Sequence, residues 1–245
     1  MAELRLIYEG VDITAFVDIA ECIHRDAAAG RLSSLDIAFD GAITWDGWAP
    51  KRGDTVTVEL NEYSTGLMYV RAPGPDDGLY RITAASATDA ILARAWASFE
   101  NRTLGQIMRA MAVECGMEWG LYGVSESRKY DYILRNNESC ALFLSRLLTA
   151  EGATLKCDNG KLLGIGLAYA AGLPIARSLE IAPDQSAFRQ TAPDEICLDL
   201  EFDPAIRALS MVEITGGSQA GVWMVTEAEH DLVEERTRAT LRRCF

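Results

Sequence analysis

The sequence predicts an α+β protein that is mostly β, with two barrel-like β domains flanking a small region of two helices and short strands. Apolar and polar residues alternate with period two in several places within the first hundred residues and again from about residue 177, which is typical of half-buried antiparallel strands. Between them the apolar period changes twice to helical spacing. We therefore predict three parts: a first β-barrel-like domain (1–98), a helical connector (99–163) and a second β-barrel-like domain (164–245).

Composition and net charge favour a globular protein and argue against one class of function. The chain has 245 residues, of which 49% are hydrophobic and 24% charged, as in a globular protein with a sizeable core. The formal net charge is −13, which argues against a nucleic-acid-binding surface, because such a surface needs clustered Lys and Arg. Nucleic acid could still pass the protein without adhering.

Neither a secretion signal nor a membrane span is expected. The first residues, MAELRLIYEG, contain no basic segment followed by an apolar one. The longest uncharged run, 162–176, is shorter than the ~20 residues that a spanning helix needs, and glycines and Pro174 interrupt it. We expect a strand, a turn and a loop there.

The cysteines are expected to be reduced thiols. The chain has six, and none forms a C-x-x-C pair: Cys22, Cys115, Cys140, Cys157, Cys197 and Cys244. Cys115 and Cys140 fall on predicted helices, where a small buried apolar role is expected.

In the first β region, Leu35, Ile37 and Phe39 share one face of a predicted strand. Residues 55–60 repeat the pattern, with the apolar side chains at 56, 58 and 60. The Pro, Asp and Gly residues of 72–80 predict a turn between two further strands.

The first helix is predicted from the apolar spacing of residues 104–115. Thr103 and Gln106 fit a capping box, in which each side chain bonds the other residue's backbone N–H. Gly116 suits a left-handed stop.

The second helix is predicted from an apolar stripe of Leu144, Leu147 and Leu148, which should pack against the first helix. We expect Asn137 to cap its start and Gly152 to end it. Residues 153–163 then predict a hairpin with an Asn-Gly turn.

Strands return towards the C-terminus. Ile196, Leu198, Leu200 and Phe202 alternate with acidic residues. In the last predicted strand, three arginines share one face and Ala239 and Leu241 the other; the arginines are Arg236, Arg238 and Arg242.

The histidines suggest little chemistry. Cys22 and His24 lie two residues apart, but a metal site needs three or four ligands and no second pair is near in the sequence. A triad of His230 with Asp231 or Asp199 would need a nucleophile motif. In the nearest candidate, around Ser218, Ala220 replaces the closing glycine, so a hairpin turn is the better interpretation.

The other polar groups have ordinary interpretations. The segment 164–169 (GIGLAY) lacks the third glycine and following helix of a dinucleotide loop. The adjacent carboxylates Asp76 and Asp77 are interpreted as turn residues. Asp199 and Glu201 are interpreted as part of a solvated strand face. Arg146 and Glu151 are expected on the polar side of a helix. We predict no catalytic, cofactor-binding or metal-binding residue, no cofactor and no enzymatic activity.

The helical segments resemble the late control protein D family, the baseplate hub proteins of phage tails and related injection machines. The pattern is T-L-x-x-I, a helix and a glycine, then E-S, F-L-x-R-L, E-G and a strand ending in G-K-L-L. Here its residues are Thr103-Leu104 with Ile107, Glu138-Ser139, Phe143-Leu144 with Arg146-Leu147, Glu151-Gly152, and Gly160 to Leu163. Segments 30–40, 50–60 and 221–243 resemble the family's two barrels in the correct order. A short hairpin at 67–80 and Cys140-Ala141 depart from it.

The resemblance implies a structural protein without catalysis. It implies a homotrimeric, pseudo-sixfold ring that joins the hexameric tail tube to the trimeric central spike, with other baseplate or wedge proteins as further partners. DNA or effector would cross the lumen, which we expect to be acidic or neutral, without specific binding. The protein would be made in the bacterial host cytoplasm and reside in the tail baseplate of a virion or a phage-tail-like particle. Contractile and non-contractile phages, defective prophages and bacteriocins all fit.

Two alternatives remain open. A cell-wall hydrolase would need a catalytic cassette, and none is visible in the sequence. A carbohydrate-binding tail component would need exposed aromatic clusters. Trp45 and Trp48 are the only close tryptophan pair, and they could serve a core, a subunit interface or a ligand platform.

Overall fold

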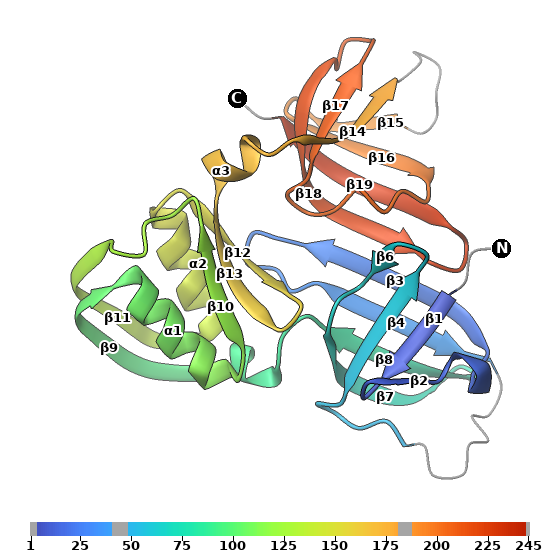
Figure 1. The fold of residues 1–245 in the computed structure, drawn as a ribbon, viewed down its shortest axis with the longest axis horizontal. Coiled ribbons are helices and arrows are strands. Elements are labelled where there is room, and N and C mark those ends of the chain that lie inside the picture. Colours follow the sequence, from blue (N-terminus) through green and yellow to red (C-terminus); the bar gives the residue numbers. More distant parts are fainter. Residues whose placement is uncertain (1–3, 41–48, 181–187, 244–245) are drawn as a thin grey trace.

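The computed structural model describes residues 4–40, 49–180 and 188–243. The chain forms three units (Figure 1): two β-rich units side by side and a third unit that carries the helices. Most residues lie in strands, so the predicted mostly-β α+β class is confirmed. Trp45, Trp48 and Cys244 lie outside the described residues.

The N-terminal β unit is built as the alternation predicts. Its strands are β1 (Leu4–Tyr8), β2 (Val11–Asp12), β3 (Ile19–Ala27), β4 (Ser34–Phe39), β5 (Thr55–Leu60), β6 (Tyr63–Ser64), β7 (Met68–Asp76) and β8 (Leu79–Ala85), with a short 3-10 helix, η1, at Thr14–Phe16. The apolar residues of β4 and β5 are buried in its core. The predicted turn at 72–80 is narrower in the structure. Asp76 still belongs to β7, and only Asp77 and Gly78 turn the chain, both with positive φ, as in a type I′ hairpin.

The helical unit places two helices between two small sheets (Figure 1). Its elements are η2 (Asp89–Leu92), β9 (Arg94–Thr103), α1 (Leu104–Cys115), β10 (Glu118–Tyr122), β11 (Lys129–Ser139), α2 (Cys140–Ala150), β12 (Ala153–Asp158), β13 (Lys161–Gly166) and α3 (Leu167–Ala171). One sheet has the order β10-β13-β12 and the other is the antiparallel pair β9-β11. The leucines of α2 share one core with the apolar side of α1, and Cys115 and Cys140 are buried in it as expected.

The helix ends confirm one cap and correct another. Thr103 and Gln106 form both bonds of the capping box, and Gly116 is left-handed. The second helix is capped by Ser139, whose hydroxyl accepts a bond from the Leu142 N–H, and not by Asn137. Asn137 has positive φ at a bulge, because β11 continues to residue 139 before the helix starts.

The expectation of a strand, a turn and a loop in residues 162–176 is partly wrong. The first residues of this run complete β13, but Leu167–Ala171 forms the short helix α3 where a turn and loop were expected. Ala and Leu favour helix, and α3 consists of one Leu, one Tyr and three Ala residues. No helix among the described residues is long and apolar enough to cross a membrane.

The C-terminal β unit contains β14 (Ile175–Glu180), β15 (Phe188–Ala192), β16 (Glu195–Glu201), β17 (Met211–Thr215), β18 (Gly221–Asp231) and β19 (Arg236–Arg243). Ile196 and Leu198 of β16 pack with Ala239 and Leu241 of β19, as their alternation predicts. Trp223 is fully buried among them, and its indole N–H donates to the Gln219 carbonyl.

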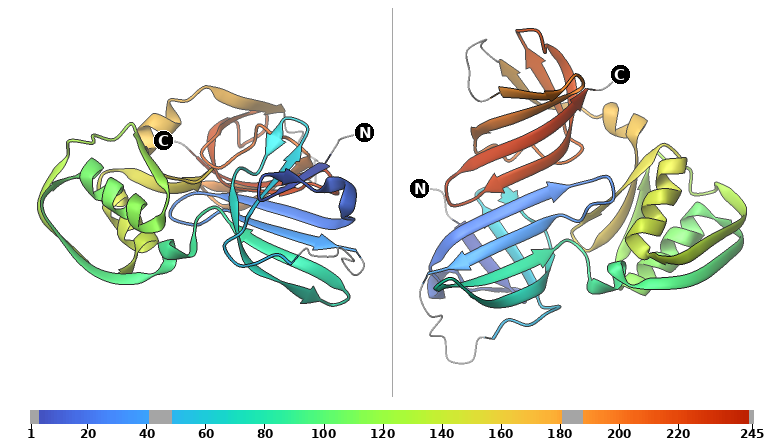
Figure 2. Two further views of the ribbon diagram at one scale, coloured as in Figure 1. Left: turned by 60° about the horizontal axis from the view of Figure 1, so that its bottom comes forward. Right: turned by 180° about the vertical axis from the view of Figure 1, so that it is seen from behind.

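The two β units are joined by backbone pairing. β3 of the first pairs antiparallel with β18 of the second, from Ile23 opposite Asp231 to Ala27 opposite Glu227. The result is one run of eight antiparallel strands, β15-β16-β19-β18-β3-β4-β8-β7, which Figure 2 shows from behind. We call the β3–β18 contact the seam.

All three units meet at a buried ion pair beside the seam. The Lys156 ammonium, on β12 of the helical unit, lies 3.0 Å from the Asp26 carboxylate on β3. It also donates to the Ala208 carbonyl of the C-terminal unit at 3.2 Å. Asp26 in turn accepts bonds from the Ala208 N–H and the Ser33 hydroxyl. Burial alone would raise the pKa of Asp26, but the Lys156 charge lowers it below its usual value.

Two histidines lie opposite each other inside the seam. His24 of β3 pairs in register with His230 of β18, and the Tyr63 ring contacts both. Burial lowers the pKa of His24 to about 3 and that of His230 to about 4. Both are therefore neutral at neutral pH.

A core substitution tests the placement of α2. Leu147 is 2% exposed, whereas Leu142 on the same helix is 58% exposed. Leu147→Asp should lower the free energy of unfolding by about 3–5 kcal/mol, because it buries an unpaired charge. Leu142→Asp should leave it within about 0.5 kcal/mol. Urea denaturation followed by circular dichroism measures both, and equal stability of the two variants would show that the helix is misplaced.

Acid should weaken the seam. An unfolded histidine binds a proton near pH 6.5, whereas these two resist protonation until about pH 4 and 3. The free energy of unfolding should thus be highest above about pH 6.5. Below that pH, each histidine should lower it by about 1.4 kcal/mol per pH unit. The chain has only these two histidines. We therefore expect the free energy of unfolding, measured from pH 7.5 to 4.5, to depend much less on pH in the double variant His24→Asn/His230→Asn than in the wild type. An unchanged slope would contradict the prediction.

Candidate functional site

The candidate site is the face of the eight-stranded run that points away from the two β cores. Alternate residues of each strand fill the cores, so the intervening ones gather on this opposite side. Charged side chains dominate it, and we call it the ion-pair face: Glu21, Arg25, Asp36, Asp76, Arg81, Asp199, Glu229, Arg236 and Arg238.

A row of alternating charges crosses five strands of this face. Arg238 of β19 lies 3.5 Å from Asp199 of β16 and 3.6 Å from Glu229 of β18. Across the seam, Glu229 lies 2.7 Å from Arg25 of β3, which lies 3.1 Å from Asp36 of β4. Strand register creates the row, because Arg238 stands opposite both Asp199 and Glu229, and Glu229 opposite Arg25.

A second bridge spans three strands of the N-terminal unit. Glu21, Ala38 and Arg81 lie in register on β3, β4 and β8. The methyl group of Ala38 is small enough for the Arg81 side chain to reach over it to the Glu21 carboxylate at 2.9 Å. The Nε of Arg81 donates to the Asp76 carboxylate at 2.7 Å. Hydrogen bonds to Asp76 and Glu21 raise the pKa of Arg81, which keeps its charge.

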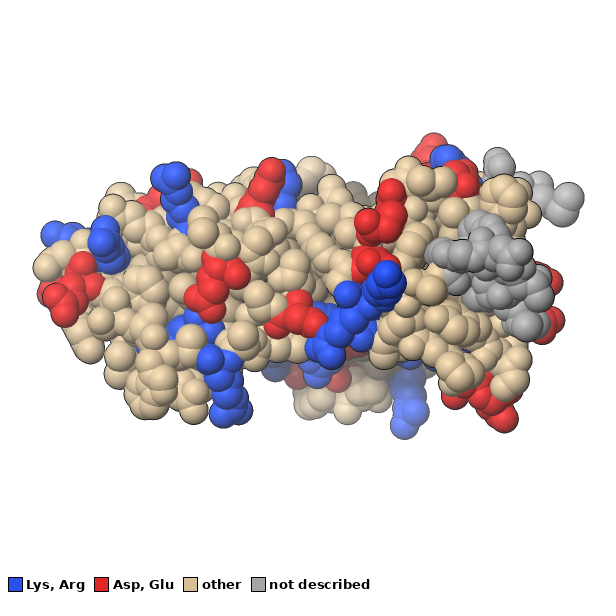
Figure 3. Space-filling view, turned by 90° about the horizontal axis from the view of Figure 1, so that it is seen from below, with Lys and Arg blue, Asp and Glu red and all other residues tan. Residues whose placement is uncertain are grey.

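These contacts neutralise the face more than they stabilise the fold. Each exposed pair contributes about 0–1 kcal/mol. The arginines at 25, 81 and 238, however, are each shared by two carboxylates, so little positive charge is free to attract a polyanion. In Figure 3 the charges of the two signs are interspersed, and neither gathers into a large area on the side shown.

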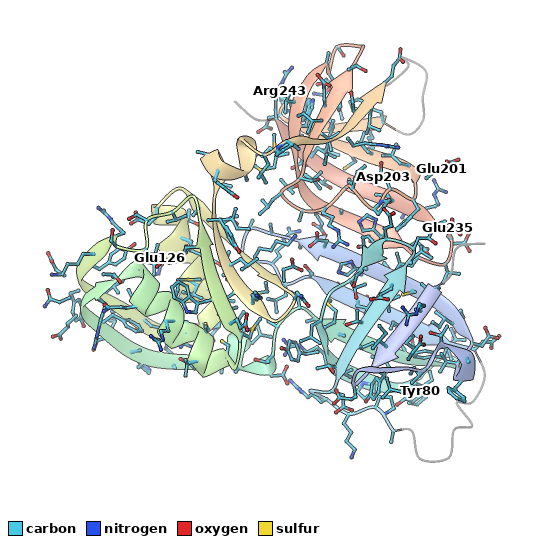
Figure 4. The ribbon with its side chains drawn as sticks, in the orientation of Figure 1. Tyr80, Glu126, Glu201, Asp203, Glu235 and Arg243 are labelled. Atoms are coloured by element: carbon cyan, nitrogen blue, oxygen red, sulfur yellow. The ribbon has the colours of Figure 1, made fainter. Side chains whose placement is uncertain are left out.

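The surface is hollowed at two places in or beside this face. A cavity of about 530 Å³ lies on the C-terminal unit and is lined by charged groups such as Arg189, Glu227 and Arg238. A larger groove of about 980 Å³ separates the two β units where β16 ends and β19 begins, and its walls include Glu62, Glu201 and Glu235. Figure 4 places Glu201 and Glu235 at this end, which is strongly acidic.

The residues weighed for a triad have other contacts. His230 is buried, and its Nδ1 lies 3.0 Å from the Thr237 hydroxyl. Asp199 pairs with Arg236 at 2.7 Å, and the Asp231 carboxylate accepts the N–H groups of residues 233 and 234. Ser218 is exposed in the connection between β17 and β18, where the predicted hairpin turn lies. The structure does not assemble these residues into one site.

The remaining candidates are structural in this fold. Cys22 is in the N-terminal core and His24 bonds Tyr63. Within the described residues no group of three metal-ligating side chains exists. Arg146 pairs with Glu138 at 3.2 Å and donates to a backbone carbonyl. Glu151 accepts a bond from the Tyr130 hydroxyl at 2.8 Å.

Sequence reasoning found half of the ion-pair face. It noted the arginines on one face of β19 and the acidic residues that alternate along β16, and the apolar face of β4 placed Asp36 on the opposite side. It missed Arg25 and Glu229, which the alternation in residues 21–25 and 227–231 could have marked as outward-facing. Their pairing joins residues 204 positions apart, for which the sequence holds no signal.

Comparisons with known proteins identify the fold. No family model matches the chain, and no curated protein matches its sequence. Among solved structures, the 43 kDa tail protein of prophage MuSo2 from Shewanella oneidensis matches with a TM-score of 0.75 at 14% identity, over 99% of this chain and 98% of that one. A tail protein from Neisseria meningitidis MC58 matches with a TM-score of 0.75 at 8% identity, over 99% of this chain and 96% of that one.

A third match comes from a secretion machine. The E. coli c3393 protein has a TM-score of 0.72 at 12% identity, over 98% of this chain and 77% of that one. It is described as a component of the type VI secretion system with structural similarity to the T4 tail proteins gp27 and gp5. The resemblance to tail hub proteins is thus confirmed at the level of the fold: over nearly its whole length the chain has the fold of phage tail and type VI secretion proteins.

Proposed function

We propose that this protein is a structural hub of a phage tail baseplate or a related injection machine, in which three copies form a ring between a hexameric tail tube and a trimeric spike. The observation that carries the proposal is the joined sheet, in which two β units stand side by side in one chain. The shared fold with tail and secretion proteins supports it.

The sheet suits a pseudo-sixfold ring. Each β unit contributes four strands to it: β15, β16, β19 and β18 from one, and β3, β4, β8 and β7 from the other. Three copies would present six such sets, which matches a sixfold partner at one end. The helical units would number only three, which suits a threefold partner at the other.

The two ends of the eight-strand run, β15 and β7, suit head-to-tail contact, although the sheet itself continues from β7 through β5 and β1 to β2. Eight strands is an even number and every pairing is antiparallel, so β15 and β7 run in opposite directions. The start of β7 already pairs with β5 through residues 68 and 69, so β15 of one copy would lie beside the rest of β7, residues 71–76, of the next copy. This placement continues the same strand order. The two surfaces differ, and such a heterologous contact closes into a ring when its rotation allows. Pro73 and Pro75 deprive β7 of two N–H groups, which limits uncontrolled edge pairing.

In such a ring the ion-pair face would line the channel. Its arginines are already engaged by carboxylates, and the whole chain is acidic. DNA or an extended effector would meet a hydrated, neutral-to-acidic wall and would pass without adhering. The protein would reside in a tail baseplate or a phage-tail-like particle, with tube, spike and other baseplate proteins as partners.

The ring contact can be tested at an exposed alanine. Ala72 lies on β7 and Ala176 on β14, and both are exposed in the single chain. The wild-type protein should have the molar mass of a trimer. Ala72→Arg should shift it to monomer at equal concentration by wedging a long cation into the contact, and Ala176→Arg should not. Light scattering coupled to gel filtration measures the mass. A wild type that stays monomeric even with tube and spike proteins would refute the ring, and a trimeric Ala72→Arg would refute this contact.

The channel hypothesis predicts a gain of DNA binding on charge reversal. Asp199→Lys/Glu229→Lys frees the paired arginines and adds two cations to the ion-pair face. It should bind labelled duplex DNA at least about tenfold more tightly than wild type at low salt, and the gain should fade as salt rises. The control Glu126→Lys/Asp131→Lys makes the same charge change on the helical unit. Tight wild-type binding in fluorescence anisotropy would contradict a repelling wall.

A further inference from the structure

A second surface of the molecule has unused chemistry. The β9–β11 pair curves around the outside of the helical unit, on the left in Figure 1. Its inner side packs on the helices, where the Phe99 ring stacks on Phe143 with centroids 5.6 Å apart. Its outer side is open, and we call it the outer β9–β11 face: Arg94, Trp96, Ser98, Glu100, Tyr132, Leu134 and Asn136.

Large aromatic side chains are exposed on this face. Trp96 is 69% and Tyr132 59% exposed, with Leu134 between them at 37%. Rows two residues apart along a strand are separated by about 6.6 Å, so the two rings stand about 13 Å apart along the ribbon. Together they make a long, shallow platform.

Each row across the two strands combines one apolar and one hydrogen-bonding side chain. Trp96 stands opposite Asn136, Leu134 opposite Ser98, and Tyr132 opposite Glu100. Arg94 precedes Trp96 on the same side of β9. The face therefore carries one cation and one carboxylate and has no net charge.

The polar groups of this face lack partners. Within the part of the chain that the structure describes, no hydrogen bond or ion pair engages the side chains of Arg94, Ser98, Glu100 or Asn136. The ion-pair face is the opposite case, since its arginines are held by carboxylates. A ligand on the outer β9–β11 face would find free donors and acceptors beside each ring.

We propose that the outer β9–β11 face binds an uncharged saccharide chain. A pyranose ring offers apolar C–H groups on its faces, which pack on the electron-rich face of an aromatic ring, and hydroxyl groups at its rim for amide, carboxylate and guanidinium partners. A protein partner is less suited, because interface cores are depleted of charged residues and more apolar than the rest of the surface, whereas polar groups interrupt this face at every row. The separation of Trp96 and Tyr132 fits several linked sugar rings.

The proposal does not depend on the ring and is tested on the whole chain. Chitohexaose and cellohexaose serve as neutral probes and polygalacturonate as an anionic one, with binding followed by calorimetry and by tryptophan fluorescence. A neutral probe should bind saturably, and Trp96→Ala and Tyr132→Ala should each weaken it about tenfold, which corresponds to about 1.4 kcal/mol. Trp96→Phe, which keeps an aromatic ring, should stay within about threefold of wild type. Val113→Ala, an equally exposed position on α1, should change nothing.

Four results would overturn the proposal. Saturable binding to neither neutral probe would do so, as would binding that Trp96→Ala leaves unchanged. Binding of polygalacturonate alone, abolished by salt, would indicate simple charge attraction. A Trp96→Ala variant that alters the oligomeric mass while no saccharide binds would identify the face as a protein interface. Unchanged melting temperatures of the variants would show that a lost affinity is not lost folding.

Discussion

The arrangement of the three units depends on the buried pair of Lys156 and Asp26. Taking two charges out of water costs several kcal/mol for each ion, and the mutual attraction compensates only when the remaining bonds are satisfied. Here they are: Lys156 has the carboxylate and the Ala208 carbonyl, and Asp26 also accepts from Ala208 and Ser33. These groups come from all three units. A shift between the N-terminal and helical units would leave buried charges unpaired, and a shift of the C-terminal unit would remove the two bonds of Ala208. The pair therefore specifies one geometry even where its net stabilisation is small.

That geometry brings the seam and the ion-pair face together. Inside the seam, the Tyr63 ring contacts both histidines, and the Arg207 guanidinium stacks on the same ring at 4.2 Å. Outside, Arg25 and Glu229 pair across the same two strands. Core packing and surface charge therefore reinforce one register. A slip of one residue would move the histidines out of the core and the charged groups into it, so the charged row is as fixed as the core beneath it.

Local features of the fold could be predicted from the sequence, whereas long-range ones could not. Period-two runs identified strands such as β4, β5, β16 and β19, and the capping box at Thr103 marked the start of α1. The cap of α2 was misplaced, because nothing in residues 136–139 shows that the preceding strand bulges and continues. The seam was not visible at all, since sequence spacing does not encode strand partners. Gly30 illustrates the limit: a side chain there would overlap Ser145 of α2, with its Cβ 2.2 Å from the hydroxyl oxygen, a contact that exists only after folding.

The two surfaces differ in how fully their polar groups are satisfied, and this difference separates their proposed roles. A wall that cargo must slide along should offer few free charges, since each unpaired group is a place to adhere. The shared arginines of the ion-pair face meet that requirement. A binding surface needs the reverse, with donors, acceptors and aromatic rings left open and held on a rigid support. The stack of Phe99 on Phe143 supplies that support behind the outer β9–β11 face. The two proposed roles are therefore compatible within one chain, because register satisfies the polar groups of the joined sheet and leaves those of the β9–β11 pair exposed.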